Sequence, residues 1–454
     1  MGIADVLVRG FGAGTGIEFR AHDGSRAGPR EASVRVEVRS QRAVNYLVQS
    51  PGELGLARAY VSGHLDVHGD VHEALSRLWS NHDDELSRRE RLDMLRALGL
   101  RSLRPVAPPP EEVRLRGRIH SKVRDAEAVS HHYDVGNRFY RWVLGPSMAY
   151  TCAVYPRADA TLEEAQATKF DLVCRKLGLR PGMRLLDVGC GWGGMVVHAA
   201  KHYGVEAIGA TLSRDQAEWG QRTVEETGLS DRAEVRWLDY RDVAEGDFDA
   251  ISSIGLTEHV GKAQLSSYFD FLLGKLRPQG RLLNHTITRH DNVYPAIPRR
   301  SFLNRYVFPD GELLGPGRIA SAMHDAGFEL RHEENLREHY ARTVAAWSAN
   351  LQDHWEEAVA EVGEGRARVW RLYLAGSRVS FEGDTLELHQ MLGVRTTNGA
   401  AGMPLRPDWE PAAGVADMPA GSSDGSGAGA EAAGSGAARQ GEPAPTRRPA
   451  RAGL

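Results

Sequence analysis

A glycine cluster that follows a short apolar segment is the feature of this sequence best suited to hold a ligand. In LLDVGCGWGG (185–194), the apolar run reaches Asp187, and Gly189, Gly191 and Gly193 precede a helical pattern. Glycine lets the backbone turn tightly and approach a bound molecule closely. Open α/β sheets bind ligands at the carboxyl ends of their strands. The segment therefore predicts a cofactor site.

The elements that must position this loop alternate between strand-like and helix-like patterns. We expect strands over 183–190, 205–212, 233–240, 248–255 and 280–288, and helices over 163–179, 195–204, 214–228 and 264–278. Strands that alternate with helices of this length imply a parallel sheet covered on both faces. The sequence therefore predicts an α/β, Rossmann-like domain over 117–397.

Three further regions differ from this domain in composition. Residues 1–104 contain the alternating valines Val34, Val36 and Val38, followed by helical patterns, and predict a smaller α+β domain. Residues 105–116 include VAPPPEE and form a proline-rich linker. Residues 398–454 are rich in Gly, Ala, Pro and Ser, have little to bury, and predict a disordered tail.

Composition limits the classes of function. The 454 residues carry a formal net charge of -4, which gives no overall signature of nucleic-acid binding. The three cysteines, Cys152, Cys174 and Cys190, fit no metal motif, and their odd number argues against a disulfide framework. No signal peptide and no membrane-spanning stretch is expected. We therefore expect a cytoplasmic protein without a metal site.

The pattern of the glycine loop could indicate either of two ligands, a dinucleotide or S-adenosylmethionine. Its spacing departs from the G-x-G-x-x-G fingerprint of dinucleotide binding, and the next strand ends in Ala210-Thr211 instead of an acidic residue. The pattern D-x-G-x-G-x-G resembles the first motif of class I methyltransferases that use S-adenosylmethionine (SAM). This resemblance implies SAM as the cofactor.

Seven motifs together resemble those of bacterial cyclopropane-fatty-acyl-phospholipid synthases and the related mycolic acid cyclopropane synthases. They occur in the family's order: HHYDVGNRFYRWVLGPSMAYTCAVYP (131–156), LLDVGCGWGG, GATLSRDQ, LDYRDV, TEHVG, HTI and YVFPDG. The resemblance covers nearly all of residues 120–395. It extends more weakly to LARAYVSGHLDVHGD (56–70), which is similar to the extra lipid-binding domain of the members that act on phospholipids.

The resemblance assigns residues to two groups. The positions implied to hold SAM are Tyr150, Thr151, Asp187, Gly189, Gly191, Gly193, Thr211, Leu212, Gln216, Asp239 and Tyr240. Those implied to hold a bicarbonate beside the reacting carbon are Cys152, Glu258, His285, Ile287 and Tyr340. Glu258 can accept a hydrogen bond from its hydroxyl. His285, the Tyr340 hydroxyl and backbone N–H groups near Cys152 and Ile287 can donate.

Taken singly, these side chains have simpler explanations. Cys152 could be a small buried hydrophobe, Glu258 a helix cap, His285 a core histidine and Tyr340 a packing aromatic. LDYRD around Asp239 could be a strand end with a solvated charge cluster. The family pattern favours the functional interpretation for all of them.

The implied reaction adds a one-carbon unit to an alkene. The sulfonium makes the SAM methyl electrophilic, and the protein must hold it against one alkene carbon. Positive charge then develops on the other carbon. Loss of a proton from the new methyl closes a cyclopropane ring, so a base must be present and water excluded. Bicarbonate is the base that the resemblance implies.

Two features bear on a lipid substrate. Aromatic residues could line an acyl tunnel: Tyr133, Tyr268, Tyr306, Trp347 and Tyr373. The basic segments 87–105 and 114–124 could dock on anionic headgroups or could be solvated helices packed on the domain. The resemblance implies unsaturated phospholipid acyl chains as substrate, peripheral membrane association and a possible homodimer.

Three alternatives remain at this stage. The first is a relative that performs the same transfer but yields a methylene-branched chain, because the position of the base is not visible in the sequence. The second is a SAM methyltransferase of a small soluble metabolite. The third is a lipid-binding protein of the same fold without activity.

Overall fold

The computed structural model describes residues 1–11, 13–80, 93, 96–113, 135–293, 300–309 and 311–410. Tyr133, most of the basic segments and the chain beyond residue 410 lie outside the described residues. Within the described ranges, we find no helix both long and apolar enough to cross a bilayer.

The N-terminal domain packs helices on a small sheet whose strand order is β2-β1-β3-β4. The predicted alternation is confirmed, because Val34, Val36 and Val38 are all buried in one core with Phe19. Its elements are α1 (Ile3–Phe11), β1 (Glu18–Ala21), β2 (Arg26–Ala27), β3 (Arg35–Val38), α2 (Gln41–Gln49), α3 (Glu53–Val61), β4 (Leu65–His68) and α4 (Val71–Ser80).

The larger domain is built on a seven-stranded sheet in the order β10-β11-β9-β8-β5-β6-β7. The strands from β9 to β7 are parallel, whereas β11 lies antiparallel between β9 and β10. The strands are β5 (Arg184–Val188), β6 (Glu206–Thr211), β7 (Ala233–Trp237), β8 (Phe248–Ile254), β9 (Leu276–Arg289), β10 (Glu329–Asn335) and β11 (Leu386–Val394).

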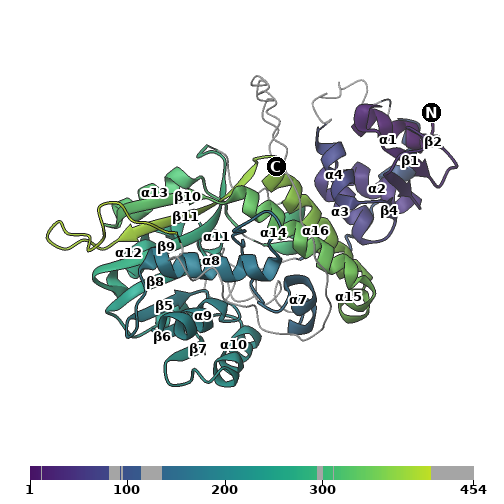
Figure 1. Ribbon diagram of the computed structural model, residues 1–454. Helices are drawn as coiled ribbons and strands as arrows, with labels where there is room; N and C mark the ends of the chain where they lie inside the picture. The colour runs from purple at the N-terminus through teal and green to yellow at the C-terminus, as the bar shows by residue number, and fades with distance from the viewer. Residues whose placement is uncertain are drawn as a thin grey trace, which may run out of the picture.

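Helices cover both faces of this sheet, as the sequence predicts (Figure 1). On one face are α8 (Leu162–Leu177), α9 (Gly194–Tyr203) and α10 (Arg214–Glu226), and on the other are α11 (Thr257–Val260), α12 (Leu265–Lys275) and α13 (Pro316–Asp325). Adjacent residues of β5 project to opposite faces of the sheet, because Leu185 packs with α8 and Leu186 packs with α12. This double coverage explains the continuous apolar run in β5 and confirms the α/β fold.

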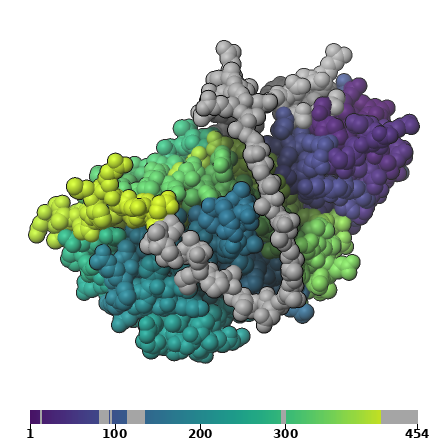
Figure 2. All heavy atoms as spheres, viewed as in Figure 1, coloured from purple at the N-terminus to yellow at the C-terminus, as the bar shows by residue number. Residues whose placement is uncertain are grey.

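A helical layer connects the two domains. It contains α7 (Asn137–Leu144), α14 (Arg337–Asp353), α15 (Trp355–Val362) and α16 (Glu364–Glu382). Arg368 of α16 donates to the Tyr60 carbonyl and to Asp66 of the N-terminal domain, both at 3.2 Å. Arg58 makes a two-pronged ion pair with the buried Glu112, at 2.7 and 2.8 Å. The N-terminal domain therefore lies against α16, on the right in Figure 2.

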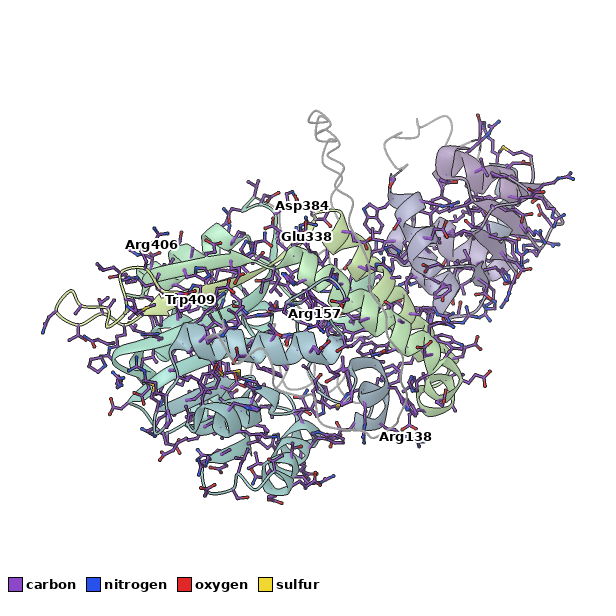
Figure 3. The ribbon with its side chains drawn as sticks, in the orientation of Figure 1. Arg138, Arg157, Glu338, Asp384, Arg406 and Trp409 are labelled. Atoms are coloured by element: carbon purple, nitrogen blue, oxygen red, sulfur yellow. The ribbon has the colours of Figure 1, made fainter. Side chains whose placement is uncertain are left out.

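The chain past β11 returns to the sheet. Residues 399–410, which the sequence assigns to the tail, include Met403 and Trp409 packed on the core beneath α8 and α9. The Trp409 ring lies 5.5 Å from that of His332 on β10, and Figure 3 labels Trp409 at this end of the sheet. Arg281 also donates to the Gly402 carbonyl. The folded domain thus extends to about residue 410.

Candidate functional site

The glycine loop lies at the carboxyl end of β5, as predicted. The backbone N–H groups of Gly189 and Cys190 both donate to the Ala210 carbonyl of β6, at 2.9 and 3.0 Å. Gly191 has a φ of +54°, and a Cβ placed there would meet no atom within 4 Å. Its backbone therefore borders open space, which is a pocket over the ends of the parallel strands.

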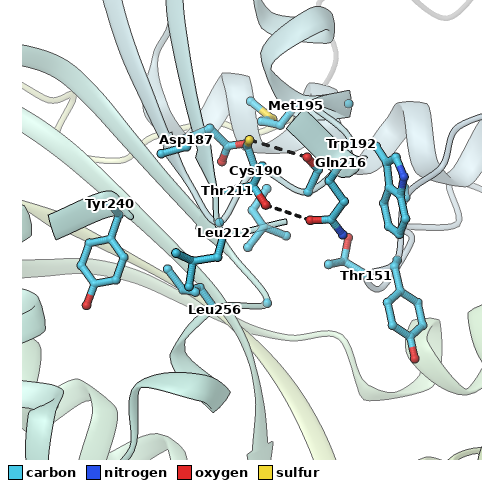
Figure 4. A pocket seen from close by; sticks show the side chains of 18 of the residues that line it. Thr151, Asp187, Cys190, Trp192, Met195, Thr211, Leu212, Gln216, Tyr240 and Leu256 are labelled. Carbon is cyan, nitrogen blue, oxygen red and sulfur yellow. Dashed lines mark hydrogen bonds between the residues drawn. The ribbon is translucent and has the colours of Figure 1, made fainter. Parts of the chain in front are cut away.

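Nine of the eleven residues implied to hold SAM line this pocket. They are Tyr150, Thr151, Asp187, Gly189, Gly191, Thr211, Leu212, Gln216 and Tyr240. Tyr240 and Trp192 lie on opposite sides of it, with Leu212 and Leu256 between them (Figure 4). Thr211 Oγ1 donates to Gln216 Oε1 at 2.8 Å, which ties the end of β6 to the first turn of α10.

The other two residues, Gly193 and Asp239, do not line the pocket. A Cβ on Gly193 would lie 3.0 Å from Val235 Cγ2 and 3.4 Å from Gly220 Cα, so this glycine allows α9 and α10 to pack closely. Asp239 accepts from the Arg241 backbone N–H at 2.9 Å and forms an ion pair with the Arg241 guanidinium at 2.5 Å. Asp239 orders the turn that presents Tyr240, and its carboxylate faces Arg241.

A buried lysine at the pocket, Lys169, was missed by the sequence analysis, whereas its neighbour at the pocket, Asp187, was predicted. Lys169 of α8 lines the pocket, lies 3.8 Å from the Phe170 ring centre, and donates to Thr151 Oγ1 at 2.9 Å. Asp187 accepts from Ser252 Oγ at 2.6 Å. Burial lowers the pKa of Lys169 to about 7 and raises the pKa of Asp187 to about 7. Titratable groups whose pKa values are strongly shifted by burial are typical of functional sites.

A sequence signal for Lys169 was present. Thr161 and Glu164 form a capping box that starts α8, and Gly178 ends the helix. With these ends known, Lys169 lies four residues before Val173, on the apolar face of the helix, where a charge is unusual. Other lining residues that the sequence analysis did not assign are Trp192, Met195, Arg241 and Leu256.

Glu258 and Ile287 contact each other directly. Glu258 is 8% exposed, on α11, and its Oε1 accepts from the Ile287 backbone N–H at 2.6 Å. The Ile287 N–H, near which a donor to bicarbonate is expected, therefore donates to Glu258 in this structure. Glu258 Oε2 has no hydrogen-bond partner among the described residues. Burial raises the pKa of Glu258 to about 7.

His285 lies on β9, 1% exposed. Its Nδ1 is 3.1 Å from Gln390 Nε2, and its Nε2 lacks a partner within the described part of the chain. Burial, together with the nearby Lys169 and Lys176, holds the pKa of His285 well below its usual range. The ring is therefore neutral and offers one nitrogen for a further contact.

Cys152 and Tyr340 share one apolar cluster with aromatic residues of α7, α14 and α16. Burial raises the pKa of the Cys152 thiol well above its usual range, so this cysteine is a thiol and not a nucleophilic thiolate. Tyr340 stacks on Phe381 with ring centres 4.4 Å apart. Ile287 packs against the same cluster.

Of the five residues implied to hold bicarbonate, Cys152, Glu258 and His285 adjoin residues that line the pocket. Cys152 follows the pocket residue Thr151 in the chain, and Glu258 lies between Leu256 and His259, which also line the pocket. The Gly255 N–H, at the pocket wall, donates to the His285 carbonyl at 2.8 Å. The structure thus brings polar groups from the loop before α8, from α11 and from β9 next to the cofactor pocket.

Among proteins of known family, this chain matches the model of the family described as mycolic acid cyclopropane synthetase over residues 120–391. It is 54% identical to a probable fatty acid methyltransferase of Mycobacterium tuberculosis, covering 87% of this chain and 95% of that protein. It is 41% identical to a probable fatty acid methyltransferase of Pseudomonas putida, covering 78% of this chain and 87% of that protein.

Solved structures agree with this assignment. The cyclopropane synthase MmaA2 from Mycobacterium tuberculosis superimposes with a TM-score of 0.56 at 34% identity, over 61% of this chain and 100% of that one. The mycolic acid cyclopropane synthase CmaA1, solved with SAH and CTAB, gives a TM-score of 0.56 at 33% identity, over 59% of this chain and 98% of that one. The chain therefore belongs to the mycolic acid cyclopropane synthetase family and is a SAM-dependent methyltransferase of that family.

Proposed function

We propose that this protein adds a methylene unit from SAM to the cis double bond of an unsaturated phospholipid acyl chain and forms a cyclopropane ring. SAM supplies a methyl group made electrophilic by its sulfonium. The protein's task is to hold the alkene against that methyl, to exclude water and to place a base beside the new carbon. Each task has residues in the described structure that can perform it.

The observation that carries the proposal is two buried polar atoms that have no hydrogen-bond partner in the part of the chain that the structure describes. Glu258 Oε2 can accept a hydrogen bond and His285 Nε2 can donate one, and both belong to residues beside the SAM pocket. A buried polar group without a partner costs free energy, so each of these two atoms calls for a partner such as a bound ion or water. An acceptor and a donor together fit bicarbonate, which has a hydroxyl and anionic oxygens.

Bound bicarbonate would supply a base for the proton that the new methyl group loses. Within this chain, Glu258 is oriented by the Ile287 N–H, and His285 is oriented by Gln390. Cys152 and Tyr340 belong to the apolar cluster against which Ile287 packs.

An aromatic enclosure adjoins this site. Tyr150 donates from its hydroxyl to that of Tyr373 at 3.0 Å, and its ring lies 5.2 Å from that of Trp347 and 5.8 Å from that of Trp370. Aromatic faces stabilise a developing cation and exclude water. Tyr268, in contrast, lies on α12, where it packs into the core on the other face of the sheet and its hydroxyl hydrogen-bonds to that of Ser253, so it is not part of this enclosure.

The names of the relatives support a lipid substrate. The two relatives described above are named fatty acid methyltransferases, and fungal relatives at 32–34% identity are named sphingolipid C9-methyltransferases. These names also favour a second candidate, in which the same transfer leaves a methyl or methylene branch instead of a ring.

The test is to incubate the purified protein with SAM carrying a ¹³C methyl group and with vesicles of cis-monounsaturated phospholipid. The released fatty acids are then analysed by mass spectrometry and proton NMR. We expect a gain of one carbon, ring protons at high field and loss of vinyl protons. Vesicles of saturated phospholipid are the control and should gain nothing.

The remaining outcomes distinguish the candidates. Terminal-methylene protons would support the branched product and contradict ring closure. A labelled product from a soluble metabolite without vesicles would contradict a phospholipid substrate. SAM binding without any labelled lipid would contradict both lipid proposals.

A further inference from the structure

Three polar side chains form a row across three neighbouring strands of the sheet. Glu334 of β10 lies opposite Gln390 of β11, and Gln390 lies opposite His285 of β9. Residues directly opposite one another in antiparallel strands project to the same face. That face is covered by α8. Leu283 lies two residues before His285 and Leu392 lies two residues after Gln390, so both project to the same face as the row, and both pack with α8. Figure 1 shows the adjacent strands β10, β11 and β9.

Lys176 of α8, the helix that covers this face, contacts two members of the row. Its side chain is fully buried, and its Nζ donates to Gln390 Oε1 at 2.7 Å and forms an ion pair with Glu334. The His332 ring and Lys176 both favour the carboxylate form of Glu334 and lower the pKa of Glu334 to about 2. Lys176 thus contacts a carboxylate and an amide oxygen, as an ammonium requires.

This contact determines the orientation of the Gln390 amide. An ammonium has donors only, so the amide oxygen must face Lys176, and the NH₂ group then faces His285 Nδ1. An amide NH₂ can only donate, so Nδ1 of His285 must accept. The proton of the neutral imidazole is therefore on Nε2.

We propose that Lys176 and Gln390 are positioning residues that hold His285 as the Nε2–H tautomer, so that this N–H donates to the anionic base of the reaction. Nε2 is the buried nitrogen that lacks a partner among the described residues. The tautomer follows from this chain's own contacts, whereas the identity of its acceptor rests on the proposed function. Gln390 cannot relay a proton as an amide, so the row orients His285 and does not conduct protons.

The test combines NMR with kinetics on the full chain. In protein labelled with ¹⁵N-histidine, the ring nitrogens of His285 are identified by their absence in His285→Asn. We expect a protonated Nε2 and an unprotonated Nδ1 in the wild type. Gln390→Glu replaces the donor with a carboxylate of similar size, so Nδ1 should become protonated. Lys176→Met frees the amide to turn and should give a mixture of tautomers.

His389→Asn is the matched control. His389 is the next residue on β11, lies on the opposite face, is buried and forms a bond of 2.7 Å to Thr288 Oγ1. Its loss removes a comparable hydrogen bond but leaves the row intact, so the His285 tautomer and kcat should not change.

Kinetics then show whether the tautomer matters for turnover. Groups that orient a functional histidine contribute about 10- to 100-fold. We expect Gln390→Glu to lower kcat by that factor and to leave the Kd of SAM unchanged.

A wild-type His285 protonated on Nδ1 would overturn the inference, as would an unchanged kcat in a Gln390→Glu protein whose tautomer has switched. The wild-type measurement decides the tautomer even where a variant fails to fold. Absence of any lipid product from the wild type would refute the proposed function instead, because the tautomer is measured without turnover.

Discussion

Substitution of Gly191 by alanine separates the two roles that a glycine can have in the cofactor loop. Gly191 has a φ of +54°, and its added methyl would meet no protein atom within 4 Å because it would project into the pocket. A left-handed conformation costs an L-residue about 1–2 kcal/mol. Folding stability should fall by that amount, and the methyl should also occupy space that SAM needs.

Gly182 provides the matched comparison. It lies in the exposed turn before β5, at the end of this strand opposite to the loop, with a φ of +80° and no atom within 4 Å of an added Cβ. Gly182→Ala should therefore cost the same about 1–2 kcal/mol and leave SAM binding unchanged.

The expected difference lies in SAM affinity alone. Forcing one extra methyl into a well-packed contact costs about 1–3 kcal/mol, which corresponds to about 5- to 150-fold in Kd. Urea denaturation measures the stability of both variants, and isothermal titration calorimetry measures the Kd of SAM. An equal Kd for Gly191→Ala and the wild type would show that the loop does not contact SAM, and the assignment of the pocket would be wrong.

Three other predictions concern stability and membrane binding. The pKa of Glu258 is about 7 in the folded state against an ordinary 4.5, so the folded state binds this proton more tightly and the free energy of unfolding falls as pH rises from 4.5 to 7. Urea denaturation at pH 5 and pH 8 should show this fall in the wild type and not in Glu258→Gln. An equal fall in the variant would contradict the shift in pKa. Truncation after Glu410 should leave the midpoint of thermal unfolding unchanged. Truncation after Asn398 should lower that midpoint, because it removes Met403 and Trp409 from the core. Equal midpoints for the two truncated proteins would show that these contacts contribute nothing to stability. Vesicle sedimentation at low salt should weaken when four arginines of the basic segment are replaced, and unchanged sedimentation would refute membrane docking through them: Arg88, Arg89, Arg91 and Arg96.

The sequence by itself determined the α/β architecture and the place of the cofactor loop. Both depend on local properties: the apolar run of β5 buried on two faces, the glycines at its end, and helices long enough to cover a parallel sheet. These signals lie within a few residues of one another, so they can be recognised without knowledge of distant contacts. The resemblance to the family added the residues around the loop, and nine of the eleven line the pocket.

Only the tertiary structure decided what the buried polar groups contact. Lys169 and Lys176 lie on the inner face of α8, which their residue type alone argues against. Gln390 reaches His285, 105 residues away, because β11 inserts antiparallel between β9 and β10. A shift of one residue in that register would turn Gln390 to the other face of the sheet. The strand order and register arise from packing over the whole domain, so no local pattern could have predicted this contact.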